Sequence, residues 1–72
     1  MEPPAPEWWK PEMHAPWFHI AADGHIACDA WTDAPADRER WRIGNCFKTR
    51  EQAEQAREQI REVFLHFHQH DA

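Results

Sequence analysis

The fold is decided by residues 17–31, WFHIAADGHIACDAW. Two short runs of mostly apolar residues flank Asp23-Gly24, and this arrangement is a strong signal for a β-hairpin. A two-residue turn would set Ile20 opposite Ala27, whereas a three-residue loop with Gly24 in the left-handed conformation sets Ile20 opposite Ile26. We favour the three-residue loop because it gathers the apolar side chains of both strands on one face. That face carries Phe18, Ile20, Ile26 and Cys28, and the opposite face carries Trp17, His19, His25, Asp29 and Trp31.

The C-terminal part of the chain reads as one long helix. Thr49 and Gln52 have the spacing of a capping box, and the following apolar residues recur at helical spacing. We therefore predict a helix from about Arg50 to about His66. Its apolar stripe consists of Ala53, Ala56, Ile60, Val63, Phe64 and Phe67. The expected core comprises this stripe together with Phe18, Ile20, Ile26, Cys28, Ile43 and Phe47.

Residues 32–43 allow two interpretations. In the first, Thr32 or Asp33 caps a short helix that has Pro35 in its first turn and Gly44 just past its end. In the second, an irregular loop leads into a short strand over Arg42–Phe47. The helix is the favoured interpretation.

The first sixteen residues contain five of the six prolines, which disfavour both helix and central strand. We read residues 1–16 as an extended Pro/Trp-rich arm and residues 17–72 as one small α+β domain. The predicted domain is a hairpin packed against one long C-terminal helix, with a third short strand as an option. With 72 residues and 15 large apolar side chains (five Trp, four Phe, four Ile, one Val, one Leu), the chain is too small for a multidomain enzyme.

Other classes are excluded by local composition. No apolar run approaches the roughly 20 residues that span a bilayer, and the N-terminal residues do not resemble a signal peptide. We therefore expect a cytoplasmic protein without a membrane-spanning segment. In a reducing cytosol, Cys28 and Cys46 are expected to be small buried groups rather than a disulfide.

Several motifs together resemble a group of small phage and prophage proteins. They are Trp9-Lys10-Pro11, the Asp23-Gly24-x-Ile26 hairpin, Trp31, Asp37-x-x-Arg40, and Gly44-Asn45-Cys46-Phe47-Lys48-Thr49 before a helix rich in Glu and Ala. The similarity extends from about residue 8 to residue 64. Where the group commonly has a glycine before the first strand, this chain has Glu12-Met13-His14-Ala15-Pro16. The resemblance implies a mobile-element origin, the cytoplasm of a bacterial host and a compact α+β fold, and it supplies no catalytic residues.

The sequence gives little support to catalysis or metal binding. The two cysteines are solitary rather than paired at the spacing of a structural zinc site, and His66, His68 and His70 lie in a polar tail. Cys46 lies near the start of the long helix, but no base is recognisably paired with it, and the chain contains no serine. We expect no enzyme activity, no cofactor and no metal site.

Charge is distributed unevenly along the chain. Residues 1–37 contain seven acids and one base, giving −6, and residues 38–72 contain six acids and seven bases, giving +1, which sum to the net −5. A basic and aromatic segment nevertheless suggests nucleic-acid binding as an alternative function, because cations bind phosphates and aromatic rings stack on bases. Its residues are Arg38, Arg40, Trp41, Arg42, Lys48 and Arg50.

Protein binding is the favoured function. Trp and Arg are enriched at interaction hot spots, and five tryptophans exceed what a small core needs. The expected contact residues are Trp8, Trp9, Trp17 and Trp31, with Arg38, Arg42 and Lys48 as a charged rim. The resemblance to phage and prophage proteins implies that the partner is a host or phage protein, including a host defence or nucleic-acid-processing factor that the protein would inhibit. The small core also suggests a homo-oligomer.

Overall fold

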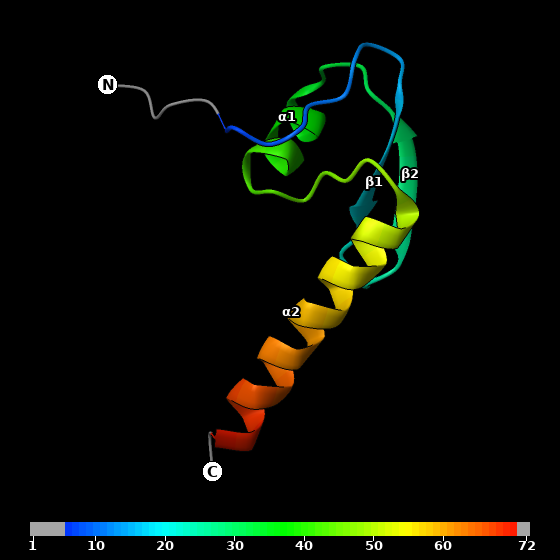
Figure 1. Ribbon diagram of the computed structural model, residues 1–72. Coiled ribbons are helices and arrows are strands. Elements are labelled where there is room, and N and C mark those ends of the chain that lie inside the picture. Colours follow the sequence, from blue (N-terminus) through cyan, green and yellow to red (C-terminus); the bar gives the residue numbers. More distant parts are fainter. Residues whose placement is uncertain (1–5, 71–72) are drawn as a thin grey trace, which may run out of the picture.

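The computed structural model describes residues 6–70 and contains a two-stranded antiparallel sheet followed by two helices (Figure 1). The elements are β1 (Pro16–Ile20), β2 (Ile26–Ala30), α1 (Pro35–Arg42) and α2 (Arg50–His70). This order confirms the predicted fold class, a small α+β arrangement with a hairpin and one long C-terminal helix. Of the arm, residues 1–5 lie outside the described residues.

The hairpin has the register that the apolar pattern favoured. Ile20 lies opposite Ile26 and Phe18 opposite Cys28, and the Ala21 amide donates to the His25 carbonyl at 2.8 Å. Gly24 has a φ of 91°, which is the left-handed conformation that a three-residue loop requires.

The segment after α1 returns to the outer edge of β1. Phe47 forms an isolated antiparallel bridge with Phe18, with N–O distances of 2.8 and 2.9 Å in the two directions. The Asn45 side chain extends this contact, because its amide group binds both the N–H and the carbonyl of Ile20. The third strand that the sequence left as an option is therefore a single bridge between Phe18 and Phe47. At the next position, the Asn45 side chain takes the place of backbone hydrogen bonds to Ile20.

Helix α1 confirms the favoured interpretation of residues 32–43. It begins at Pro35, and Gly44 follows its end with a φ of 88°. Neither proposed side-chain cap is used: Ala34 occupies the cap position and offers no side-chain bond. Instead Asp37, inside the first turn, accepts hydrogen bonds from the amide and hydroxyl of Thr32, each at 3.0 Å.

Helix α2 begins where the capping box predicted and extends four residues beyond the predicted end. The Gln52 amide donates to Thr49 Oγ1 at 3.1 Å, while the Gln52 side chain accepts from the Lys48 amide at 3.2 Å. Only the first turns of α2 contact the hairpin, and the rest of the helix projects beyond it (Figure 1). The radius of gyration is 14.0 Å, compared with about 11 Å for a compact chain of this length.

The core lies mainly on the hairpin face that was expected to be outside. Trp17 and Trp31 are 0% and 2% exposed, and Cys46 packs with them, while Trp9 and Trp41 add partly buried surface. The arm and α1 cover this face, so burial is decided by segments distant in sequence rather than by the apolarity of the strands. The predicted core was therefore largely wrong. Phe18, Ile20, Ile26, Phe47 and Ala56 are only half-buried, Cys28, Ile43, Ile60, Val63, Phe64 and Phe67 are exposed, and Ala53 alone is fully buried.

Candidate protein-binding surfaces

The described part of the arm folds back over the core. The Lys10 ammonium lies 5.0 Å from the ring centre of Trp41 and 5.8 Å from that of Trp31. Pro11 is buried, and the His14 amide donates to the Trp31 carbonyl at 2.7 Å. Paired cation–π contacts are each worth about 0.5–1 kcal/mol at partly exposed sites. The arm thus acts as a strap that closes the tryptophan face of the hairpin.

Trp8 is the tryptophan of the arm that stays accessible. Its indole N–H donates to the Trp41 carbonyl at 2.8 Å, while the residue remains 49% exposed. The bond fixes the ring at the C-terminal end of α1, where Ile43 is 74% exposed and Arg42 is also exposed. We call Trp8, Arg42 and Ile43 the Trp8 surface.

The other expected contact residues have different positions. Trp17 and Trp31 pack edge to face, with their ring centres 5.7 Å apart, at the centre of the core. They are therefore unavailable to a partner, and this part of the predicted contact surface is wrong. Trp9 is half-buried against the same cluster.

The basic residues do not form a single patch with open aromatic rings. Arg38 lies 3.9 Å from the Asp33 carboxylate, and Arg50 lies over the Phe18 ring at 5.3 Å. Trp41, the expected stacking surface, is partly buried and has Lys10 above it. Lys48 and Arg42 are exposed and Arg40 is half-buried.

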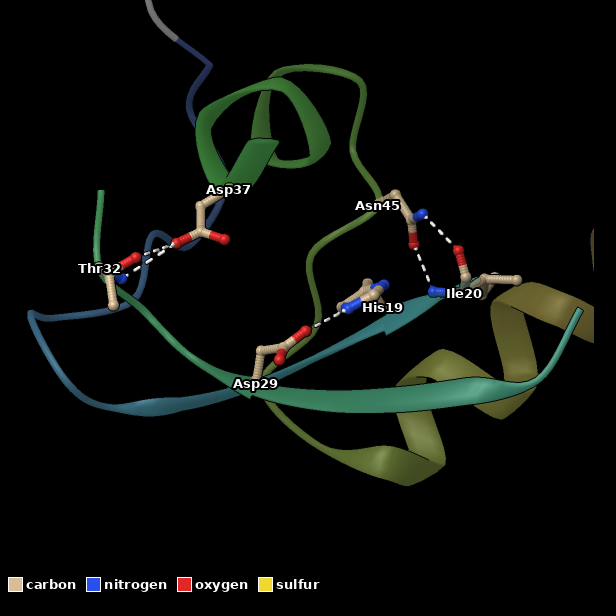
Figure 2. Close-up of polar contacts among 6 residues, drawn as sticks. All are labelled: His19, Ile20, Asp29, Thr32, Asp37 and Asn45. Atoms are coloured by element: carbon tan, nitrogen blue, oxygen red, sulfur yellow. Dashed lines mark hydrogen bonds and ion pairs between the residues drawn. The ribbon is translucent and has the colours of Figure 1, made fainter. Parts of the chain in front are cut away.

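Two buried polar side chains, His19 and Asp37, are each held by a hydrogen-bonding partner (Figure 2). His19 is 4% exposed, and its Nε2 lies 2.7 Å from Asp29 Oδ2 across the hairpin. Asp37 is 8% exposed and receives both donors of Thr32. The pairing with Asp29 satisfies only one of the two ring nitrogens of His19, since Nδ1 is buried without a hydrogen-bond partner within the described residues, whereas the Asp37 carboxylate is satisfied by Thr32. These residues therefore act in the structure rather than at an open site.

The two cysteines are free thiols that differ in burial. Burial, with a smaller contribution from the Asp37 carboxylate, raises the pKa of Cys46 to about 11 from 9.0. The thiol is therefore protonated near neutral pH and is a poor nucleophile. Cys28 is exposed, contrary to the expectation that it faces the core, and both thiols are free. Among residues 6–70, no three His, Cys, Asp or Glu side chains gather closely enough to hold a metal ion.

A second candidate surface was missed because its residues were assigned to the core. The distal half of α2 exposes Val63, Phe64 and Phe67 by 65, 62 and 64%, and Ile60 by 42%. Spaced three, four and seven residues from Ile60, they form one stripe, which we call the α2 stripe. Leu65, 47% exposed, lies on the opposite side of the helix.

The α2 stripe continues into a groove beside the hairpin loop. The groove has a volume of about 450 Å³ and is walled by Ile20 and Ala21 on one side and by Ile60 and Phe64 on the other. Arg57 crosses near one end, where its guanidinium donates to the Gly24 carbonyl at 3.3 Å. Ile60 and Phe64 belong both to the α2 stripe and to the groove, whose lining also includes Arg57 and Arg61.

Comparison of the chain with protein-family models, curated proteins and solved structures found no match. Neither helix of the described region combines the length and apolar character needed to cross a membrane.

Proposed function

We propose that this protein is a non-enzymatic binding protein whose Trp8 surface contacts another protein. The observation that carries the proposal is the hydrogen bond from the Trp8 indole to the Trp41 carbonyl. It holds a half-exposed ring in one place before any partner arrives, which lowers the ordering cost of binding. Trp is also one of the residue types enriched at the energetic centre of an interface.

The chemistry of the surface defines the complement it would fit. Trp8 and Ile43 offer apolar contact area, and Arg42 offers a cation beside it that forms no ion pair within residues 6–70. An apolar pocket bordered by a carboxylate would match this set. Arg38 and Lys48, both exposed, extend the positive rim.

The class of partner rests on the sequence resemblance to small phage and prophage proteins. On that basis the partner is a host or phage protein in the bacterial cytoplasm, and inhibition of a defence or nucleic-acid-processing factor is the expected consequence. Nucleic-acid binding by residues 38–50 is the alternative. It has less support, because Lys10 covers Trp41 and Arg50 is held over Phe18.

The test compares two single variants at exposed apolar residues of the arm. Trp8→Ala removes the proposed anchor, and Met13→Ala is the matched control because Met13 is 55% exposed and takes no part in the hydrogen bond between Trp8 and Trp41. Each protein is immobilised and used to capture partners from lysate of the bacterium that carries the gene, with quantitative mass spectrometry as the readout. Loss of a hot-spot residue, worth at least about 2 kcal/mol, corresponds to roughly thirtyfold weaker binding.

We expect one species to be captured by the wild type and by Met13→Ala and to be depleted at least tenfold with Trp8→Ala. Near-ultraviolet circular dichroism checks that the core of Trp17 and Trp31 is intact in both variants. Equal capture by Trp8→Ala would contradict the assignment of this surface. A fluorescent oligonucleotide that binds at low salt, and whose affinity falls steeply as salt rises, would favour the alternative function.

A further inference from the structure

We propose that the α2 stripe is the interface of a homodimer, in which the distal halves of two α2 helices pack antiparallel about a two-fold axis. The stripe comprises Ile60, Val63, Phe64 and Phe67. It uses a surface distinct from the Trp8 surface, so the two proposals stand independently.

The amount of exposed apolar area is the first reason. Two Phe side chains exposed by more than 60%, with Val63 and Ile60 beside them, present on the order of 500 Å² on one helix. At complete burial, two copies together would then remove about 1,000 Å² from water, which is at the lower limit for a biological interface. The monomer leaves this area uncovered within residues 6–70.

The geometry of the helix is the second reason. The apolar side of α2 begins at Ala53, which is fully buried, and continues as the α2 stripe on the part of the helix that extends past the end of the sheet (Figure 1). Antiparallel pairing places the two hairpin bodies at opposite ends of the helix pair. Parallel pairing would instead bring both bodies to the same end.

The groove gives the pairing a specific register. If the two-fold axis passes between Val63 and Phe64, Phe67 of one copy lies beside Ile60 of the other. Ile60 forms part of the wall of the apolar groove of about 450 Å³, so this register offers each Phe67 ring a concave apolar site. One surface is used twice, as a closed two-fold contact requires.

The charge of the segment does not oppose a second copy as the occupant. The whole chain carries −5, but residues 57–69 contain two Arg and two Glu and are formally neutral. Two copies therefore meet through the segment where their mutual repulsion is smallest. A strongly charged partner would gain nothing from such a surface.

The first experiment measures mass by sedimentation equilibrium from micromolar to millimolar protein. We expect the wild type to approach 17.2 kDa, twice the 8.6 kDa of the chain, and Phe67→Glu to remain at 8.6 kDa. The matched control is Leu65→Glu, which places the same charge on the opposite side of the same helix and should remain dimeric. Circular dichroism confirms that both variants keep the helix.

A wild type that stays at 8.6 kDa throughout overturns the proposal, as does equal dissociation by Leu65→Glu. Assembly beyond a dimer overturns the closed two-fold contact. Trp8→Ala should leave the mass unchanged, which separates this result from the outcome of the capture experiment.

The second experiment tests orientation by distance between spin labels at Glu51→Cys, in a Cys28→Ser background that leaves only the buried Cys46. Position 51 lies about 12 residues before the proposed axis, so the two labels are offset by 25 residues along the antiparallel pair, or roughly 38 Å at 1.5 Å per residue. Parallel helices would bring the labels within roughly 20 Å of each other. A single short distance overturns the antiparallel arrangement.

Discussion

Replacing Asn45 with alanine is expected to destabilise the fold by about 2 kcal/mol. Asn45 Oδ1 accepts from the Ile20 amide at 2.7 Å, and Nδ2 donates to the Ile20 carbonyl at 2.8 Å (Figure 2). Each net hydrogen bond is worth about 1 kcal/mol, and a buried group left without a partner costs about 1–3 kcal/mol. Because the site is only part-buried, water recovers some of that cost. In a domain of this size the loss corresponds to a melting temperature lower by roughly 10 °C.

The assay is urea unfolding at 25 °C, monitored by the fluorescence of the buried tryptophans. The dependence of the unfolding free energy on urea concentration should be the same in the wild type and in the variant. Gln55→Ala, on an exposed part of α2, is the control and should change stability by less than about 0.5 kcal/mol. An equally small change in Asn45→Ala would refute the idea that Asn45 replaces a backbone pair.

Asn45→Asp provides a sharper version of the same test. The carboxylate retains the acceptor for the Ile20 amide but places a second oxygen against the Ile20 carbonyl. Only the protonated acid can donate there, so the folded-state pKa of this Asp should lie above its unfolded value of about 3.9. Its stabilising effect is then present below pH 4 and lost as the pH rises. Relative to Asn45→Ala, Asn45→Asp should gain stability between pH 7 and pH 4, and no gain would contradict the geometry.

The remaining predictions concern the cysteines and the arm. The pKa of Cys46 is raised to about 11 in the folded state from 9.0. The contribution of the protonated Cys46 thiol to the free energy of unfolding is therefore fully present below pH 9 and falls by up to about 2 kcal/mol between pH 9 and pH 11. Cys46→Ala should make the free energy of unfolding less dependent on pH over this range. A thiol reagent at pH 8 should modify Cys28 rapidly in the native protein and Cys46 only on unfolding, and equal rates would contradict the burial of Cys46. Lys10→Ala should lower the free energy of unfolding by about 1 kcal/mol through loss of both cation–π contacts, measured by urea unfolding, whereas Lys10→Arg should keep most of it.

Local features of the chain were predictable from sequence. The hairpin register follows from the Asp23-Gly24 pair and strand alternation, and the start of α2 follows from Thr49 and Gln52. In each case the deciding residues lie within a few positions of one another. The end of α1 at Gly44 belongs to the same class, because its positive φ is a requirement of the local backbone.

The choice of the buried face could not be read in the same way. Phe18 and Ile20 are more apolar than His19, yet His19 is buried because Asp29 binds its ring and the arm and α1 cover that face. Lys10 contacts Trp31 and Trp41, which follow it in the sequence by 21 and 31 positions. No periodicity in the sequence encodes such a contact.

The exposure of the α2 stripe could have been anticipated from lengths alone. The helix predicted over residues 50–66 would be about 25 Å long at 1.5 Å per residue. A five-residue strand covers only about 17 Å, so the hairpin is too short to bury a stripe that ends at Phe67. Assigning every apolar residue of a periodic helix to the core overlooked this mismatch.

Because the arm docks on residues that follow it in the sequence, it is synthesised before them but can fold into place only after them. Trp8 and Lys10 leave the ribosome before the residues they contact, since Trp31 and Trp41 are made later. The arm therefore has no docking site until the hairpin and α1 exist, and its indoles are exposed in the nascent chain. The arm is made before the residues on which it docks and is placed after them, so a chaperone that recognises aromatic segments would bind this protein at its arm.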